Sequence, residues 1–197
     1  MRLPYVDPAD PNKFSNTDAA AVVDRVRQRR HPRPLQPLDL TLLHSPAFAD
    51  GWNSFIGAVR TKLTLPDDIR EIAICRVAIR NGAWYEWHHH APLAKAGGVS
   101  DEGMDILARD DLPPPFPAVQ TSDADGLTEK QLVVAHYADA MTSDVKVSDE
   151  LFGRLNKLFN DQEVVEITGT VAAYNCVSRF LVALNVGERN GPKPHTL

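Results

Sequence analysis

The sequence predicts an all-α protein, and three observations lead to this prediction. Apolar residues recur with helical spacing through most of the 197 residues, capping patterns precede these segments, and no segment shows the strict alternation of a half-buried strand. The apolar fraction of 43% and the charged fraction of 24% are ordinary for a globular protein with a sizeable core. We therefore expect a helical bundle, preceded by an N-terminal arm.

The predicted arm comprises residues 1–37 and is rich in proline at both ends. Between the prolines, Ser15 to Arg30 reads as a helix, with Ser15 and Asp18 spaced like a capping box. The following stretch PRPLQPLDL predicts an extended linker, because each proline disfavours helix in the residue before it. The main domain is expected over residues 38–187, with a tail over residues 188–197.

Start and stop signals divide the main domain into successive helices. Pro46 after Ser45 predicts a helix to about Lys62, which we expect to bury Phe48, Trp52, Phe55, Ile56 and Val59. Asn81-Gly82 separates a helix that starts at TLPDD from one over residues 84–96, and Pro92 should kink the latter. Ser100, Thr128, Ser148 and Asn160 each precede a further predicted helix, and the last one ends near Leu184. DLPPPFP predicts a loop in mid-chain.

Composition argues against several classes of protein. The net charge of −5 gives no support for nucleic-acid binding. No apolar stretch approaches the length of a membrane span, and the polar N-terminus lacks an apolar signal core, so we expect a cytoplasmic protein with no membrane contact. Cys75 and Cys176 lie within apolar helical patterns, which predicts buried, reduced thiols.

The chemistry is concentrated in WYEWHHH at residues 84–90. Glu86 and His90 are four residues apart, so they share a helix face and can form a hydrogen bond. A carboxylate on an imidazole fixes its tautomer and raises its basicity, which suits proton transfer. Glu71 on the preceding helix could reach the same place across the Asn81-Gly82 break. The alternative is a Glu–His pair on the surface without a function.

Metal and thiol chemistry have weaker support. Consecutive helical residues point about 100° apart, so His88, His89 and His90 cannot all bind one ion. We therefore predict no metal site. A disulfide-based redox site needs a thiol beside a resolving thiol, and neither cysteine has such a neighbour in the sequence.

One long segment resembles the carboxymuconolactone decarboxylase family, which includes the alkylhydroperoxidase D-like proteins. The segment is LPDDIREIAICRVAIRNGAWYEWHHHAPLAKAGGVSDEGMDIL, and LLHSPAFADGWNSF and YNCVSRFLVALNVG add weaker support, so that the resemblance covers roughly residues 38–187. Alkylhydroperoxidase members carry a Glu, a C-x-x-C pair and a His. The Glu falls on Glu71 and the His on His90, whereas the cysteines fall on Ala83 and Glu86.

The resemblance implies an alkylhydroperoxidase D-like bundle and a thiol-free site of the decarboxylase type. It implies a carboxy-lyase that acts on a carboxylated lactone from aromatic degradation, without a cofactor and as a homo-oligomer. His90 would be the general acid/base, held by Glu86 and assisted by Glu71. The residues expected around the small-molecule substrate are Tyr85, Trp87, His89, Asn175 and Arg179, with Arg76 as a further candidate to hold its carboxylates. The alternatives are a non-catalytic binding or assembly protein and an alkylhydroperoxidase-like antioxidant protein.

Overall fold

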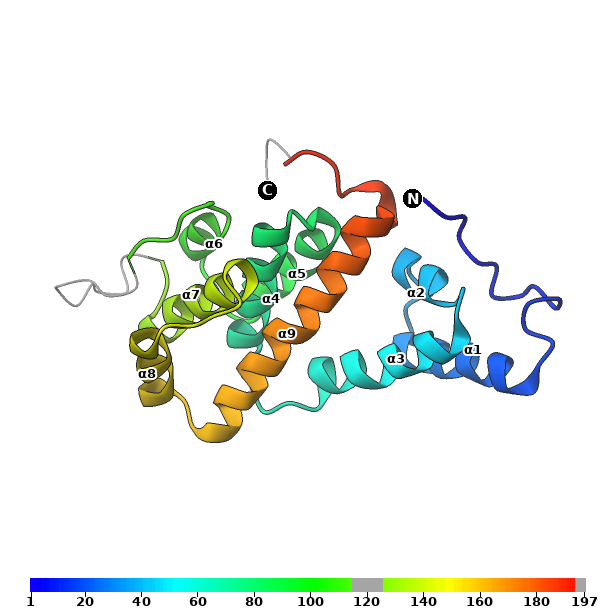
Figure 1. Cartoon of the computed structure of the whole chain (residues 1–197), viewed down its shortest axis with the longest axis horizontal. Coiled ribbons are helices and arrows are strands. Elements are labelled where there is room, and N and C mark those ends of the chain that lie inside the picture. The colour runs from blue at the N-terminus through cyan, green and yellow to red at the C-terminus, as the bar shows by residue number, and fades with distance from the viewer. Residues whose placement is uncertain (115–125, 194–197) are drawn as a thin grey trace. The chain divides into compact units, whose positions relative to one another are not determined.

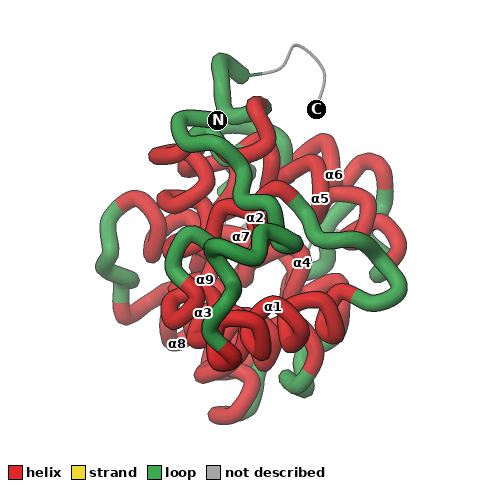
Figure 2. Tube along the Cα trace, turned by 90° about the vertical axis from the view of Figure 1, so that its right-hand side faces the viewer, coloured by secondary structure: helices red, strands yellow, loops and turns green. Residues whose placement is uncertain are grey.

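The structure is a computed structural model and describes residues 1–114 and 126–193. Within these residues every regular element is a helix, as the tube in Figure 2 shows, which confirms the all-α prediction. The chain forms two compact units. The first contains Met1–Leu63 with Leu184–Glu188, and the second contains Thr64–Ala183 with the residues from Arg189 onward.

The first unit consists of α1 (Thr17–Arg30), α2 (Pro37–Leu42), α3 (Pro46–Thr61) and the short 3-10 helix η2 (Val186–Glu188). Helices α1 and α3 pack together (Figure 1). Their contact buries Val22, Val23 and Val26 of α1, and Trp52, Ile56 and Val59 of α3. At one end of α1 the buried carboxylate of Asp39 accepts hydrogen bonds from Arg29 and from Arg30, at 3.2 and 2.8 Å.

Three local expectations for the first unit were wrong. Asn16, not Ser15, caps α1, and its side chain accepts a hydrogen bond from the Asp18 N–H. The predicted linker contains α2, because Pro37 occupies its first position, where a missing N–H does no harm. Phe48 and Phe55 are 49% and 53% exposed, whereas we expected α3 to bury them.

The second unit consists of α4 (Asp67–Asn81), α5 (Trp84–Ala96), α6 (Asp101–Leu107), α7 (Glu129–Ser143), α8 (Asp149–Leu158) and α9 (Asp161–Leu184). Helix α4 lies in its centre and packs against α5 and α7 (Figure 1). All residues from Glu71 to Ile79 are buried, which is why this stretch reads as almost continuously apolar. The predicted DLPPPFP loop lies partly outside the described residues.

Arg76 is the charged group buried most deeply on α4. Its Nε and Nη2 atoms donate to the two oxygens of Asp139 on α7, at 2.8 and 2.5 Å. Its Nη1 atom donates to the carbonyls of Leu107 and Arg109, each at 2.7 Å. One guanidinium therefore joins α4, α7 and the end of α6, and its hydrogen bonds compensate for the loss of water.

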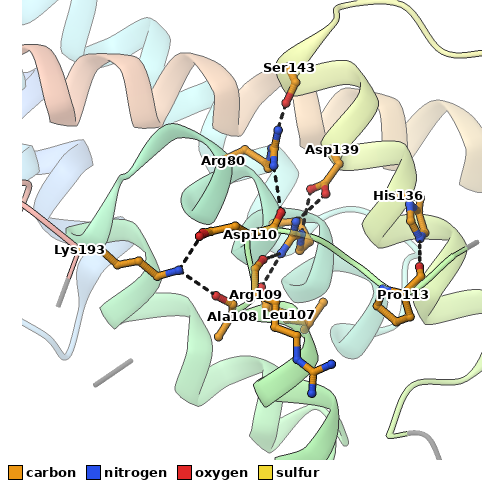
Figure 3. A network of polar contacts seen from close by, with 11 residues as sticks. Arg80, Leu107, Ala108, Arg109, Asp110, Pro113, His136, Asp139, Ser143 and Lys193 are labelled. Atoms are coloured by element: carbon orange, nitrogen blue, oxygen red, sulfur yellow. Dashed lines mark hydrogen bonds and ion pairs between the residues drawn. The ribbon is translucent and has the colours of Figure 1, made fainter. Parts of the chain in front are cut away.

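A further set of contacts fixes the chain just after α6 (Figure 3). Arg80 donates to the hydroxyl of Ser143 and to the carbonyl of Asp110. Lys193 forms an ion pair with the side chain of Asp110 at 2.8 Å. Lys193 is thus held within the second unit.

Helix α9 contacts α4 and α7 through polar side chains. The Asn81 amide donates to Asn175 and Ser178, and the hydroxyls of Tyr137 and Thr168 are 2.9 Å apart. Within the described ranges, α9 alone has the length and apolar composition of a membrane span, although we expected no such segment. The core helix of a globular protein meets the same criterion, and 44% of the most apolar window of α9 is buried.

Candidate functional site

The candidate site is built on a tight hairpin between α4 and α5. Gly82 follows α4 with φ 61° and ψ 31°, a left-handed conformation that glycine adopts without steric cost. The Ala83 N–H donates to the Ala78 carbonyl at 2.8 Å, and α5 begins at Trp84. Such a short connection makes the two helices antiparallel neighbours. Residues at equal distances from the turn therefore face each other.

Glu71 and His90 meet across this hairpin. The Nδ1 atom of His90 lies 2.6 Å from Glu71 Oε2. The Glu71 side chain is 1% exposed and that of His90 is 12% exposed. Because a carboxylate can only accept, Nδ1 carries the hydrogen, and the neutral ring then has its lone pair on Nε2. The arrangement is that of a proton-transfer residue with a carboxylate that orients it.

Two other side chains complete the surroundings of this pair. Arg70 places its Nε atom 3.3 Å from Glu71 Oε1, so the second oxygen of the carboxylate also has a cationic donor. Tyr174 of α9 packs edge-on against the His90 ring, with the ring centroids 5.0 Å apart. Tyr174 could not be selected from the sequence, because an aromatic residue in an apolar helix is an ordinary core residue.

Glu86 does not have the expected position. We predicted that it would hold His90, but Glu71 forms that hydrogen bond from the neighbouring helix. Glu86 is 2% exposed, and neither carboxyl oxygen has a hydrogen-bond partner in the part of the chain that the structure describes. Burial raises the pKa of Glu86 well above its ordinary value, because desolvation disfavours the charged form.

Cys75 lies on α4, one turn closer to the hairpin than Glu71. It is completely buried, and desolvation together with the charges of Glu71 and Glu86 raises the pKa of its thiol well above the usual value. A thiol of this kind is a poor nucleophile. Cys176 is exposed, contrary to the prediction that both cysteines would be buried, and both thiols are free.

The other residues expected around the substrate lie in several environments. His89 is partly exposed, with its ring 4.5 Å from that of Tyr85, whereas Trp87 is buried and His88 is exposed. The backbone N–H of Tyr85 donates to the Asn190 side chain at 3.1 Å. These residues share α5 with His90, but their contacts do not assign them to a substrate.

The cationic candidates form hydrogen bonds with other residues of the second unit. Arg179 is exposed, and its hydrogen bonds in the described chain go to the backbone and side-chain oxygens of Asn175. The Asn175 amide donates to Thr142 on α7 at 2.9 Å. The buried bonds of Arg76 described above leave it a structural role.

Over residues 1–114 and 126–193, no group of three or more His, Cys, Asp and Glu side chains is arranged to hold an ion.

The hairpin and its flanking helices match a known protein family. Residues 46–124 match the model of the carboxymuconolactone decarboxylase family. This segment is similar to the carboxymuconolactone decarboxylase family. The match includes Glu71, Glu86 and His90, so the resemblance found in the sequence is confirmed for the segment that carries the candidate site.

Solved structures show the same fold over more of the chain. The apo debrominase Bmp8 superposes with a TM-score of 0.68 at 17% identity and covers 92% of this chain and 89% of its own. A variant of that debrominase with a cysteine replaced by alanine, in complex with 2,3,4-tribromopyrrole, gives 0.69 at 17% identity, covering 94% and 90%. An Agrobacterium tumefaciens protein of unknown function, named as an AhpD antioxidant defence protein candidate, gives 0.58 at 22% identity, covering 72% and 90%.

These identities establish the fold and leave the reaction open. No curated protein shows a significant sequence match to this chain.

Proposed function

We propose that this protein is a member of the carboxymuconolactone decarboxylase family, and an enzyme that needs no cofactor and transfers a proton on a carboxylated lactone or a related intermediate of aromatic degradation. The observation that carries the proposal is the buried hydrogen bond between Glu71 and His90. It supplies an imidazole with a fixed tautomer, which is the group that a general acid/base reaction requires.

The proposed reaction is a decarboxylation. The bond between carbon and the substrate carboxylate breaks, CO₂ leaves, and the electron pair moves into a conjugated carbonyl system. Protonated His90 then delivers a proton from Nε2 to carbon, and the ring recovers its proton from water. Glu71 acts by holding the imidazole through Nδ1 and by stabilising its charged form while it is an imidazolium.

The cysteine environments favour this reaction over thiol chemistry. The positions of the alkylhydroperoxidase cysteines are occupied by Ala83 and Glu86. Cys75 is sealed in the core as a neutral thiol, and exposed Cys176 lies on α9. A variant that carries both Cys75→Ala and Cys176→Ser should therefore retain turnover, whereas a thiol peroxidase would lose it.

The test is turnover of 4-carboxymuconolactone, followed by ultraviolet absorbance. His90→Ala should lower kcat by about a hundredfold or more, the usual contribution of a general acid. His88→Ala is the matched control, because the same residue type is removed from an exposed position two residues earlier. It should turn over like the wild type, and circular dichroism should show both variants helical.

Two outcomes would contradict the proposal. Equal rates for His90→Ala and wild type would remove His90 from the reaction. Absence of turnover in the wild type, for this lactone and for related carboxylated enol-lactones, would favour the non-catalytic binding protein as the function of this fold.

A further inference from the structure

We propose that Glu86 is a neutral carboxylic acid that donates a hydrogen bond to the carbonyl oxygen of the substrate as that oxygen becomes an enolate. This inference rests on the proposed function and narrows its substrate class. The substrate is then a compound whose carbonyl is conjugated with the carbon that loses its carboxylate and receives the proton.

The first support is the lack of a partner for a buried acid. Both oxygens of Glu86 are shielded from solvent, and neither has a hydrogen-bond partner among the described residues. Native proteins satisfy most buried polar groups, so an exception requires an explanation. A ligand oxygen at this position would accept the carboxyl hydrogen and satisfy it.

The second support is the position of Glu86 in the hairpin. It lies one turn before His90 on the same face of α5, so both side chains are directed toward α4. On α4 the titratable groups facing this part of α5 are Glu71, which holds His90, and Cys75, which is buried one helical turn closer to the hairpin. An acid and a proton-transfer residue thus lie side by side, one helical turn apart.

The third support is the electrostatic environment of the Glu86 carboxyl group. An ionised Glu86 would put a second buried anion near Glu71, and desolvation opposes it. A neutral carboxyl is a strong donor to an anion, and a hydrogen bond to a charged oxygen is about twice as strong as one between neutral groups. Glu86 would therefore bind the enolate more tightly than the ground-state carbonyl, which is what catalysis requires.

In the proposed step, His90 is the only group that donates a proton to carbon. When the carbon–carboxylate bond breaks, its electron pair forms the enolate, whose oxygen accepts the Glu86 O–H hydrogen bond. The enolate electron pair then takes the proton of His90 Nε2, and a new C–H bond forms. Glu86 keeps its proton throughout, so it stabilises charge and is not consumed.

The first experiment determines the protonation of Glu86 without any substrate. The infrared spectrum of the wild type near neutral pH should contain a band from a protonated carboxyl group, and Glu86→Gln should lack it. Cys75→Ala is the matched control, since it changes the neighbouring side chain on α4, and it should keep the band. A spectrum without such a difference would show an ionised Glu86 and overturn the inference.

The second experiment uses 4-nitrophenol as a probe, because its absorbance distinguishes phenol from phenolate and the phenolate resembles an enolate. The wild type should bind the phenolate, and Glu86→Leu should weaken binding by about ten- to a hundredfold, the range for a lost hydrogen bond to a charged group. Glu86→Gln retains an N–H donor and should lose less affinity, while Cys75→Ala should bind like the wild type.

The outcomes separate this inference from the proposed function. Equal phenolate affinity in wild type and Glu86→Leu, or no binding by the wild type, overturns the role of Glu86 even if the lactone is turned over. Binding that depends on Glu86, without turnover of any lactone, supports the acid and rejects the decarboxylase. If Glu86→Leu does not fold, Glu86→Gln gives the same test through the infrared band and the smaller loss of affinity.

Discussion

At the scale of single residues, Glu86 links the stability of the protein to pH. Burial raises its pKa in the folded state, whereas in the unfolded chain it ionises at the ordinary pKa of 4.5. Between these two values the folded protein binds the additional proton, so stability falls as pH rises. Below pH 4.5 Glu86 is neutral in both states and the free energy of unfolding carries no penalty from its ionisation. This free energy then decreases progressively as the pH rises toward the folded pKa.

Glu86→Gln should remove this pH dependence. The amide has nearly the same shape and cannot ionise, so the variant should match the wild type near pH 4.5 and exceed its free energy of unfolding at higher pH. The difference should grow by up to about 1.4 kcal/mol per pH unit. Urea unfolding at several pH values measures it, and a constant difference between the two proteins would contradict the prediction.

The same residues show how much of the candidate site could be predicted from the sequence. Glu71 and His90 were selected from the family pattern, and the structure places them 2.6 Å apart. The pairing of Glu86 with His90 was wrong because a spacing of four residues only makes a contact available on one helix. Glu71 reaches His90 from another helix, and which of the two acids does so depends on how α4 and α5 align.

At the scale of elements, the alignment of α4 and α5 depends on both ends of their hairpin. Gly82 makes the turn, and Gly97 lies at the far end of α5 against the first turn of α4. A Cβ atom on Gly97 would lie 2.9 Å from the backbone nitrogen of Asp68 and 3.1 Å from the carbonyl carbon of Asp67. Backbone atoms cannot rotate away, so a larger residue would push the helices apart.

Gly97→Ala should therefore destabilise the protein by about 1–3 kcal/mol, as overpacking does. It should also lower kcat, because α5 would shift relative to Glu71.

Gly153→Ala is the matched control, because Gly153 lies in α8 and a Cβ atom there would have no neighbour within 4 Å. That variant should gain about 0.5–1 kcal/mol from helix propensity and leave turnover unchanged. Thermal unfolding and the lactone assay distinguish these results, and equal behaviour of the two variants would contradict the close approach at Gly97.

Helix positions were predictable where the signal was local. Ser100, Thr128 and Ser148 cap α6, α7 and α8 through their side chains, and these short-range bonds are visible as sequence spacing. Helix α2 was missed because two prolines before it suggested an extended chain, although the third, Pro37, begins a helix. The exposure of Phe48 and Phe55 was missed because α3 has apolar residues on more than one face, and spacing does not show which face is covered.

At the scale of the whole molecule, the division into units follows packing rather than the family pattern. The predicted arm ended at residue 37, whereas the first compact unit extends to Leu63. Helix α3 belongs to it because its buried face packs against α1. The family match begins at residue 46, so it includes α3 and crosses the boundary between the units. Sequence similarity and compactness therefore divide this chain at different places.

The exposed aromatic residues of α3 lead to a prediction about assembly. Phe48 and Phe55 are about half exposed and lie two helical turns apart on one face, where apolar surface is costly to leave in water. We predict that copies of this chain associate and cover these rings, so that sedimentation gives a mass above the 21.8 kDa of one chain.

Phe55→Glu should weaken this association by about tenfold or more, because a symmetric interface would then bury two negative charges, one from each copy. Val145→Glu alters a more exposed apolar residue outside the helices and should keep the mass of the wild type. A wild type that sediments as a single chain would show that this face does not mediate self-association.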